Sequence, residues 1–453
     1  PPTTDPRGTR RFTVRSFRGS DKTVASPAPR RRCRNGARRA ATGRLSTGGG
    51  ERHAVNDRTR ALVVACVAVF LPVLVWYNYS AVLPTVSADW GLTGAQAGIV
   101  FGAFQAGYLV GILPFGRLAD SSSPRYVLAG GAAGTAVFGV GFGLIAEGFL
   151  AGTALRFLAG VCMSGVYVPG MRLLSDWFPA AERGRAIGIY VGTFSLSSGV
   201  SFVVTSRLAA ATDWETAVVA TSLGGLLVAP LVVWLLDDAP GRSATSRGID
   251  LSLLRNREYL HAVNAYAWHT WELFGVRNWL LAFLLAAPAF ASGGASASLA
   301  GLLVGVVTAM SAVGNVVGGA LSDRIGRPTT VGIGLLGSTA ILVALGWLDW
   351  LPLWALAAVL LVHGTLLSVD SAPASTLVTE AVDDEQVGAA LSLQSFVGFL
   401  PSVVSPVAFG AALDAGGFVL AWPTLAVAGP LGLASVVALR RRARRGSTAS
   451  GSA

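Results

Sequence analysis

Long apolar stretches alternate with short polar ones along most of the chain. A helix that crosses a membrane needs about 20 mostly apolar residues. Twelve stretches meet that requirement, and we place them at 61–84, 95–115, 126–146, 150–174, 186–208, 215–236, 259–287, 298–320, 329–348, 351–378, 388–413 and 418–439. Inside hydrocarbon every backbone N–H and C=O group must be paired within its own segment, and these stretches are too long for barrel strands. The pattern therefore predicts an all-α membrane protein with about twelve transmembrane helices.

A polar stretch at 237–258 divides the predicted helices into two groups of six. We predict an N-terminal six-helix bundle at 61–236 and a C-terminal six-helix bundle at 259–439. The polar stretch between the bundles is predicted to be a cytoplasmic linker. Residues 440–453 are predicted to form a basic cytoplasmic tail.

Arginine is concentrated on one side of the predicted helices. Cytoplasmic connections of membrane proteins carry an excess of Lys and Arg. With the N-terminus inside, the inner connections carry Arg117, Arg125, Arg183, Arg185, Arg242, Arg247, Arg255, Arg257, Arg324 and Arg327. The outer connections carry acids such as Asp89, Glu147, Asp213, Asp349 and Asp414. We therefore expect a multi-pass protein of the cell membrane, with both termini in the cytoplasm.

The composition also indicates that lipid is the main solvent of the chain. Charged residues make up 13% of the sequence, whereas soluble domains carry about 25%. The formal net charge of +11 comes from residues 1–60, which hold 16 of the 35 basic and 4 of the 24 acidic residues. This segment is rich in Arg, Gly, Ser and Pro, so it cannot bury a core. We expect a disordered cytosolic extension rather than an arm that binds nucleic acid or anionic lipid.

The start of translation is a separate question, because the chain begins with Pro1 rather than Met. The residues 48–51 would be encoded by a purine-rich stretch of the kind that ribosomes bind, and Val55 follows as a candidate GTG start. We expect the mature chain to begin near Val55, so residues 1–54 would be untranslated. The intact mass of the native protein checks this, and peptides from residues 7–44 would contradict it.

A short motif occurs once in each predicted bundle. It reads Gly116-Arg-Leu-Ala-Asp120 after the second predicted helix and Gly319-Ala-Leu-Ser-Asp323-Arg324-Ile-Gly326-Arg327 after the eighth. Such internal repeats are common in transporters. The second copy resembles in full the signature loop of the major facilitator superfamily. The first copy keeps the glycine and the acid, but it continues through three serines and a proline to Arg125 and lacks the family's basic residue directly after the acid.

Two further segments carry this resemblance, which covers about residues 60–440. Arg156-Phe-Leu-Ala-Gly160 is similar to the family's fourth-helix arginine motif, and residues 177–186 are similar to its loop between the fourth and fifth helices. The resemblance implies a proton-, ion- or exchange-coupled carrier. It also implies a central site between two six-helix bundles that rock against each other.

The repeated loops are physically suited to a gate. Glycine lets two helix ends approach closely, and the carboxylates of Asp120 and Asp323 are favoured at the N-terminal end of a neighbouring helix. Arg324 and Arg327 can pair with acids or with lipid phosphates at the inner surface. We expect these contacts to form in one state of a carrier and to break in the other.

Ionisable residues inside membrane helices are costly and mark functional sites. In the seventh predicted helix, His269 and Glu272 are three residues apart, so they share a helix face near mid-membrane. Loss of water at that depth favours a neutral carboxyl group, which suits reversible protonation. We take Glu272 as the first candidate for proton coupling, His269 as its partner and Asp370 as a second candidate. The alternative for the first two is a structural contact between helices.

Other polar residues of the predicted helices are candidates for binding a substrate. They are Arg156, Arg277, Gln105, Tyr77, Asn78, Asn315, His363 and Gln394. The neutral residues among them serve equally well to hold helices together. The arginines favour an organic or inorganic anion. Nitrate carriers of the family usually have an arginine in the second helix, and 95–115 has none, so nitrate itself is not predicted.

Several classes of protein are disfavoured by the sequence. Lys22 is the only lysine, so the chain has no Walker A lysine beside a predicted helix and is not an ATP-driven pump. The sequence shows no metal-ligand spacing and no catalytic motif, so we expect no metal, no cofactor and no enzyme. We predict a monomeric secondary transporter of a small molecule or ion, coupled to protons and working by alternating access. A drug or metabolite exporter and a membrane sensor that transports nothing remain the alternatives.

Overall fold

The computed structural model describes residues 47–239, 251–291, 296–383 and 386–450. Most of the basic segment predicted at 1–60 and the middle of the linker predicted at 237–258 therefore lie outside the described residues. Residues 54–453 form one unit, separate from residues 1–53.

Six long helices form the first half of this unit: α1 (Thr47–Trp90), α2 (Gly94–Ser121), α3 (Pro124–Ile145), α4 (Phe149–Trp177), α5 (Ala180–Ala211) and α6 (Trp214–Leu235). Their ends follow local sequence signals. Thr93 and Gln96 form a capping box at the start of α2, and Asp213 accepts the backbone N–H of Thr216 over 2.6 Å at the start of α6. Such side-chain acceptors replace the partners that the first N–H groups of a helix lack.

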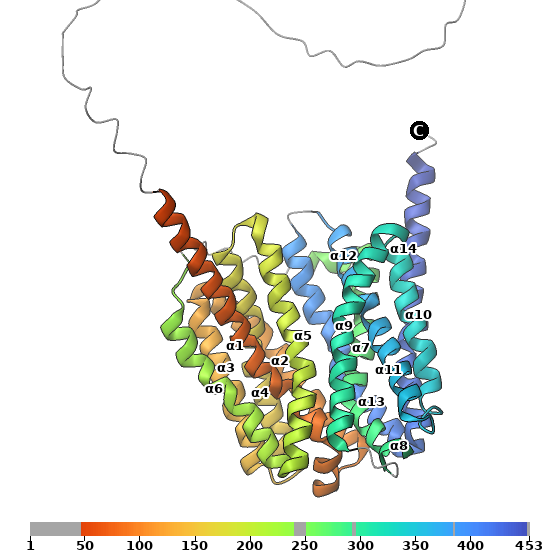
Figure 1. Ribbon diagram of the computed structural model, residues 1–453. Helices are drawn as coiled ribbons and strands as arrows, with labels where there is room; N and C mark the ends of the chain where they lie inside the picture. Colours follow the sequence, from red (N-terminus) through yellow and green to blue (C-terminus); the bar gives the residue numbers. More distant parts are fainter. Residues whose placement is uncertain (1–46, 240–250, 292–295, 384–385, 451–453) are drawn as a thin grey trace, which may run out of the picture. The chain divides into compact units, whose positions relative to one another are not determined.

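The second half contains a short 3₁₀ helix and eight α-helices among its described residues: η1 (Leu251–Arg255), α7 (Arg257–Ala286), α8 (Pro288–Ala291), α9 (Ala297–Ile325), α10 (Arg327–Leu345), α11 (Leu353–Val369), α12 (Ser371–Glu380), α13 (Val387–Ala426) and α14 (Ala428–Ser450). Figure 1 shows this half, in green to blue, beside the first half, in red to yellow-green. The halves meet where α13 packs on α2 and where α9 packs on α5.

Ten helical segments of the described residues are long and apolar enough to cross a membrane. One of them, 387–441, contains two crossings, because α13 leaves the helical conformation at Gly416 and Gly417. The 30-residue helix α7 is not among the ten, since polar and ionisable side chains interrupt its apolar pattern. With α7 and the divided segment, the helices supply the twelve crossings that the sequence predicts. The all-α fold is confirmed.

The division of α13 depends on glycine. Gly417 has a φ of 67°, a backbone conformation that side chains with a Cβ atom rarely adopt. Pro401 and Pro406 lie within the part of α13 that keeps the helical conformation. The chain therefore turns into its last crossing at the glycine pair and not at the prolines.

Glycine residues also bring the two halves into backbone contact at one end. Gly94, Gly98 and Gly102 recur every four residues on α2, so they form one stripe along the helix. A Cβ atom at any of them would collide with the backbone of α13, at Gly410, Pro406 or Val403. The absence of side chains here lets α2 and α13 pack as closely as helices joined by a GxxxG motif.

An acidic side chain completes this contact. Asp414 of α13 accepts the backbone N–H groups of Gly94 (2.6 Å) and Ala95 (3.0 Å). Both N–H groups are in the first turn of α2, where the helix itself offers them no carbonyl and where its dipole favours negative charge. A carboxylate of the second half thus caps a helix of the first half. We call this end of the unit the capped end.

The helices α5 and α9 also approach each other most closely toward the capped end. Near the capped end, the Cα of Gly199 lies so close to α9 that an added Cβ would be 2.7 Å from the carbonyl oxygen of Gly305. Gly188 and Gly192, nearer the start of α5, have no atom within 4 Å of the position that a Cβ would take. Close backbone contact between these two helices is therefore confined to the part nearer the capped end.

The repeated loops lie at the opposite end. Gly116 and Gly319 have no atom within 4 Å of a Cβ position, so the expected close approach of helix ends at these glycines is wrong for this conformation. Ion pairs of these loops join residues of the same half: Asp120 with Arg172 (3.6 Å), Arg125 with Asp237 (3.5 Å), and Arg327 with Asp323 (3.2 Å) and Glu380 (2.9 Å). Gly326, with a φ of 86°, joins α9 to α10. A gating role for these loops, Arg324 included, stays a prediction.

Replacing Asp414 with Ala should make the capped end open more often, because α2 loses the acceptor for two N–H groups. Loss of a helix cap costs about 0.5–2 kcal/mol, which corresponds to roughly 2- to 30-fold more frequent opening. The measurement is the rate at which a maleimide modifies Ser80→Cys, a buried position whose native hydroxyl donates to Asn278 of the other half over 3.1 Å. The native cysteines are replaced beforehand. Asp89→Ala, at an exposed acid near the end of α1, is the control, and equal rates in both variants would contradict the role of Asp414.

Candidate functional site

Ionisable side chains of α7 meet partners from α10 to α12 inside the second half. His269 Nδ1 lies 2.9 Å from Asp370 Oδ1, and both side chains are 3% exposed. The sequence suggested Glu272 as the partner of His269, and the structure corrects this pairing. Asp370 stands at the junction where α11 ends and α12 begins, and Gly334 of α10 leaves room for its side chain.

Glu272 belongs to a second buried cluster. It accepts a hydrogen bond from the hydroxyl of Ser338, which also lies 3.0 Å from His363 Nε2. His363 Nε2 is 3.5 Å from Glu272 Oε1. The hydroxyl of Ser338 can donate one hydrogen bond and accept others, so it can bridge the carboxyl group of Glu272 and the imidazole of His363. The two acids of this region are therefore each tied to a histidine, one directly and one through a serine.

Arg277 is a buried charged group of α7 that has no acidic partner in the part of the chain that the structure describes. Its side chain is 7% exposed. Nη1 donates to the hydroxyl of Tyr77 over 3.0 Å, and Nη2 donates to the hydroxyl of Ser311 over 3.3 Å. Tyr77 belongs to α1 in the first half, whereas Ser311 belongs to α9 in the second. Neutral hydroxyls from both halves thus hold a buried cation.

A cavity of about 150 Å³ lies beside these groups, between the two halves. Its polar lining includes His269, Arg277, Ser311 and Asn315, and most of its remaining wall is aromatic. Glu272 and His363 do not line it. The His269–Asp370 pair therefore has one member at the cavity, while the Glu272–Ser338–His363 cluster is enclosed by helices of the second half.

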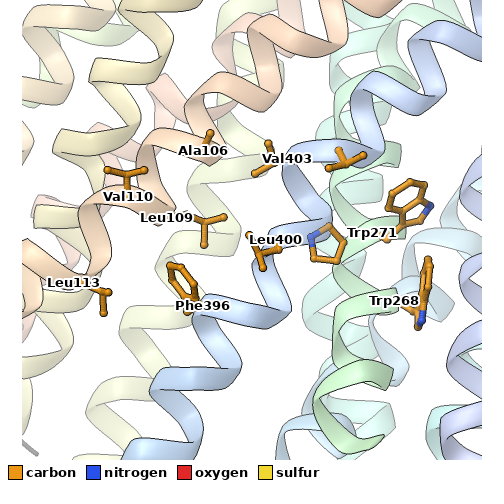
Figure 2. Close-up of a pocket in the computed structure, with 11 residues that line it drawn as sticks. Ala106, Leu109, Val110, Leu113, Trp268, Trp271, Phe396, Leu400 and Val403 are labelled. Carbon is orange, nitrogen blue, oxygen red and sulfur yellow. The ribbon is translucent and has the colours of Figure 1, made fainter. Parts of the chain in front are cut away.

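A larger cavity of about 700 Å³ has a different character (Figure 2). It is lined by apolar side chains of α2, α7 and α13, with Trp268 and Trp271 on one side and Leu109 and Phe396 on the other. Its rim includes highly exposed apolar residues such as Val110 (60%) and Val404 (53%). Such residues are typical of a surface that faces lipid. The lining contains no charged group that would bind an ion.

Comparison with known proteins places this chain within a family. The family model of the Major Facilitator Superfamily matches residues 65–294 and 273–453. The chain belongs to the major facilitator superfamily. It is similar to the probable sulfoacetate transporter SauU of Cupriavidus necator, with 28% identity over 294 residues, 61% of this chain and 67% of that protein. It is 26% identical to human protein spinster homolog 1 over 314 residues, 62% of this chain and 59% of that protein.

Further matches agree on the fold. The hexuronate transporter of Bacillus subtilis is 22% identical over 371 residues, 76% of this chain and 86% of that protein. A crystal structure of a bacterial homologue of the human lysosomal transporter Spinster, in an inward-facing and occupied conformation, has a TM-score of 0.69 at 18% identity. It covers 84% of this chain and 94% of that chain. The chain is thus a transporter of this superfamily and not an enzyme.

The superfamily's fourth-helix arginine has a structural position in this transporter. Arg156 is 2% exposed and donates to the backbone carbonyls of Val75 (2.6 Å) and Trp76 (3.0 Å) in α1. Its guanidinium lies 4.5 Å from the ring centroid of Phe104. Arg156 does not line the cavity. It holds the part of α1 that carries Tyr77, so its predicted contact with substrate is replaced by a contact that positions α1.

The remaining predicted residues also divide into those at the cavity and those that link helices. Asn315 lines the cavity, and Tyr77 contacts Arg277. Asn78 donates to Thr221 and Ser222 of α6, and Gln394 donates to Ser375 of α12, so both link helices. Gln105 is buried in α2, one turn before the cavity residue Tyr108.

Sequence reasoning missed Ser311 and Ser338. Both hydroxyls complete the site, one at Arg277 and one between Glu272 and His363. A serine in an apolar helix is common, and whether its hydroxyl binds an ionisable group depends on which helix faces it. Knowledge of the helix arrangement is the signal that would have identified them.

Replacing Ser338 with Ala should destabilise the protein, because a buried carboxyl group and a buried imidazole would lose their shared partner. An unsatisfied buried polar group costs about 1–3 kcal/mol. The measurement is thermal unfolding of the purified protein in detergent. Ser395→Ala is the matched control, since this serine is exposed and donates only to Leu391 O of its own helix in the described contacts. Equal melting temperatures for the two variants would show that Ser338 does not stabilise the cluster.

Proposed function

We propose that this transporter carries a small anion across the cell membrane, coupled to protons, by alternating access. The observation that carries the proposal is Arg277, a buried guanidinium at the cavity whose described hydrogen bonds go to neutral hydroxyls. A buried cation is costly unless a charge of opposite sign lies nearby. The acids of the region are tied to histidines, so the substrate is the natural source of that charge.

The position of Arg277 also suits alternating access. Its partners Tyr77 and Ser311 come from different halves. An anion that takes the place of these hydroxyls would contact both halves at once, in the middle of the protein, where carriers of this type bind their substrates. Substrate binding would thereby change the contact that joins the halves.

The names of relatives support an anion. The probable transporter SauU is named for sulfoacetate, the Bacillus subtilis protein for hexuronate, and a cyanobacterial relative, 30% identical over 156 residues, for nitrate and nitrite. All of these substrates are anions. The chain matches 59–67% of the length of SauU and the spinster relatives, so their substrates serve as a guide to charge and not to identity.

The pair His269–Asp370 is our candidate for proton coupling. His269 lines the cavity and contacts Asp370 directly, so a proton that enters this pair changes the charge felt by a bound anion. Glu272, the first candidate on sequence grounds, lies in the enclosed cluster with Ser338 and His363. We assign that cluster a structural role within the second half.

The orientation follows from arginine placement. We propose that both termini are cytoplasmic and that the capped end faces outward, since the arginine-bearing loops lie at the opposite end. The described contacts between the halves then correspond to a conformation closed toward the outside. We further propose that the protein works as a monomer, because each half supplies part of one cavity.

Replacing Arg277 with Gln should weaken anion binding, because the cavity loses its cation. A hydrogen bond to a charged group contributes about 1.5–3 kcal/mol, so affinity should fall at least about tenfold. The measurement is thermal stabilisation by a panel of anions, cations and neutral metabolites, since a ligand of the folded state raises its stability. Arg207→Gln, at an exposed arginine of α5, is the control. A panel in which only cations stabilise the protein would refute the anion proposal.

Replacing Asp370 with Asn should uncouple transport from protons while leaving exchange of substrate intact. An amide cannot bind and release a proton, but it keeps the size of the side chain beside His269. The measurement compares uptake driven by a pH gradient with counterflow at equal pH, in proteoliposomes. Asp349→Asn, in the loop between α10 and α11, is the control. Retention of gradient-driven uptake in Asp370→Asn would exclude this residue as the coupling site.

A further inference from the structure

The wall of the central cavity is dominated by aromatic rings from both halves. They are Trp76, Tyr108, Tyr167 and Phe194 in the first half, and Tyr266, Phe274 and Phe399 in the second. The rings contact one another: the centroid of Trp76 lies 4.9 Å from Tyr108 and 5.3 Å from Phe194. Phe274 lies 5.5 Å from Phe399 and stacks on Trp76 across the two halves, with centroids 6.3 Å apart. A ligand in this cavity is therefore surrounded mainly by ring surfaces.

Arg277 is the one arginine of the lining, and neutral hydroxyl groups line the cavity as well. Besides Ser311 they belong to Tyr108, Tyr167, Ser195, Tyr266, Thr270, Ser368 and Ser371. The amide of Asn315 donates to the carbonyl of Ser311 in its own helix over 2.9 Å, and Nδ1 of His269 is taken by Asp370. Arg277 keeps its guanidinium at the cavity, and Ser311 accepts from it, so the hydroxyl proton of Ser311 is free to donate. The cavity can therefore bind one anionic group at Arg277 and Ser311, while the rest of its lining consists mainly of aromatic rings and neutral hydroxyl groups.

The volume of the cavity limits the ligand to a small molecule. It measures about 150 Å³, below the roughly 300–1,000 Å³ of pockets for drug-sized ligands. An apolar cavity of about 150 Å³ in another protein binds one benzene molecule. One ring or one branched aliphatic group thus fills this space, with its charged group turned toward Arg277.

The charge of the cavity favours one negative charge on the ligand. Arg277 supplies one positive charge, while Asp370 and Glu272 are each paired with a histidine. A second anionic group would have to lie against aromatic faces, which carry the negative part of the ring quadrupole. A dianion is therefore a poor match for the cavity.

We propose that the ligand is a compact organic monoanion with a single ring or branched apolar body, such as an aromatic carboxylate or sulfonate. This inference rests on the proposed function, since it takes the anionic group to bind at Arg277. It differs from what relatives named for hexuronate or nitrate would suggest. A sugar acid would cover the ring surfaces less completely than an apolar ring does, and an inorganic anion would leave them without a contact.

The test compares four probes on the purified wild-type protein: benzoate, its neutral analogue benzamide, glucuronate and nitrate. Their affinities are obtained from thermal stabilisation over a concentration series and from competition with uptake of labelled benzoate. A buried polar group without a partner lowers affinity strongly, and a site discriminates against groups that it cannot pair. We expect benzoate to bind at least tenfold more tightly than each of the other three.

A pair of variants tests the wall itself. Phe194 is half-buried and lies edge-on to both Trp76 and Tyr167, with centroids 5.3 and 5.2 Å apart. Phe194→Asn should reduce the preference for benzoate over glucuronate, because it adds a polar partner to the wall. Phe194→Leu keeps the wall apolar and should keep the order of preference. Melting temperatures of both variants without ligand show whether each is folded.

The outcomes separate this inference from the proposed function. Tighter binding of glucuronate or nitrate than of benzoate overturns the inference and leaves an anion transporter in place. Equal binding of benzamide and benzoate overturns both, since charge would then not contribute. No response to any of the four probes, or unchanged preference in Phe194→Asn, overturns the assignment of an apolar monoanion to this cavity.

Discussion

A charged group inside a membrane protein needs compensation close by, because neither lipid nor the packed interior solvates it. This constraint organises α7 and its neighbours. Asp370 contacts His269, which lines the cavity. Glu272 is linked to His363 through the hydroxyl of Ser338. The described hydrogen bonds of Arg277 are donated to hydroxyl groups alone. One helix therefore contributes two compensated acid–histidine contacts and one buried cation without an acidic partner among the described residues.

Close helix packing determines where this chemistry can meet the aqueous phase. The glycine stripe of α2 and the contact of Gly199 with Gly305 draw the halves together near the capped end. The equivalent surfaces toward the repeated loops, at Gly188 and Gly192, are not in such contact. Arg156 fixes α1 to α4 by binding two backbone carbonyls. This link lies wholly within the first half, so it can be kept when that half moves as a unit.

Much of the fold was predictable, since membrane helices must be apolar and must pair their own backbone groups. The sequence also identified Arg277, His269, Glu272 and Asp370, because ionisable residues in such helices are conspicuous. It failed where the outcome depended on helix rotation. His269 and Glu272 share a broad face, yet that face meets two different clusters. Gly116 and Gly319 belong to a recognisable motif, but the close approach occurs at other glycines, which only the packing of whole helices reveals.

The polarity of α7 has a consequence for biosynthesis. A charged residue at the centre of a helix raises the cost of its insertion by about 2.5–3.5 kcal/mol, and α7 lacks the apolar pattern of the other crossings. The groups that compensate Glu272 and His269 are made later in the chain, on Ser338, His363 and Asp370. At about 5–20 residues per second, the ribosome needs on the order of 5–20 s to reach them. During that interval α7 must be held by the insertion machinery or by the finished first half, because lipid alone would not retain it.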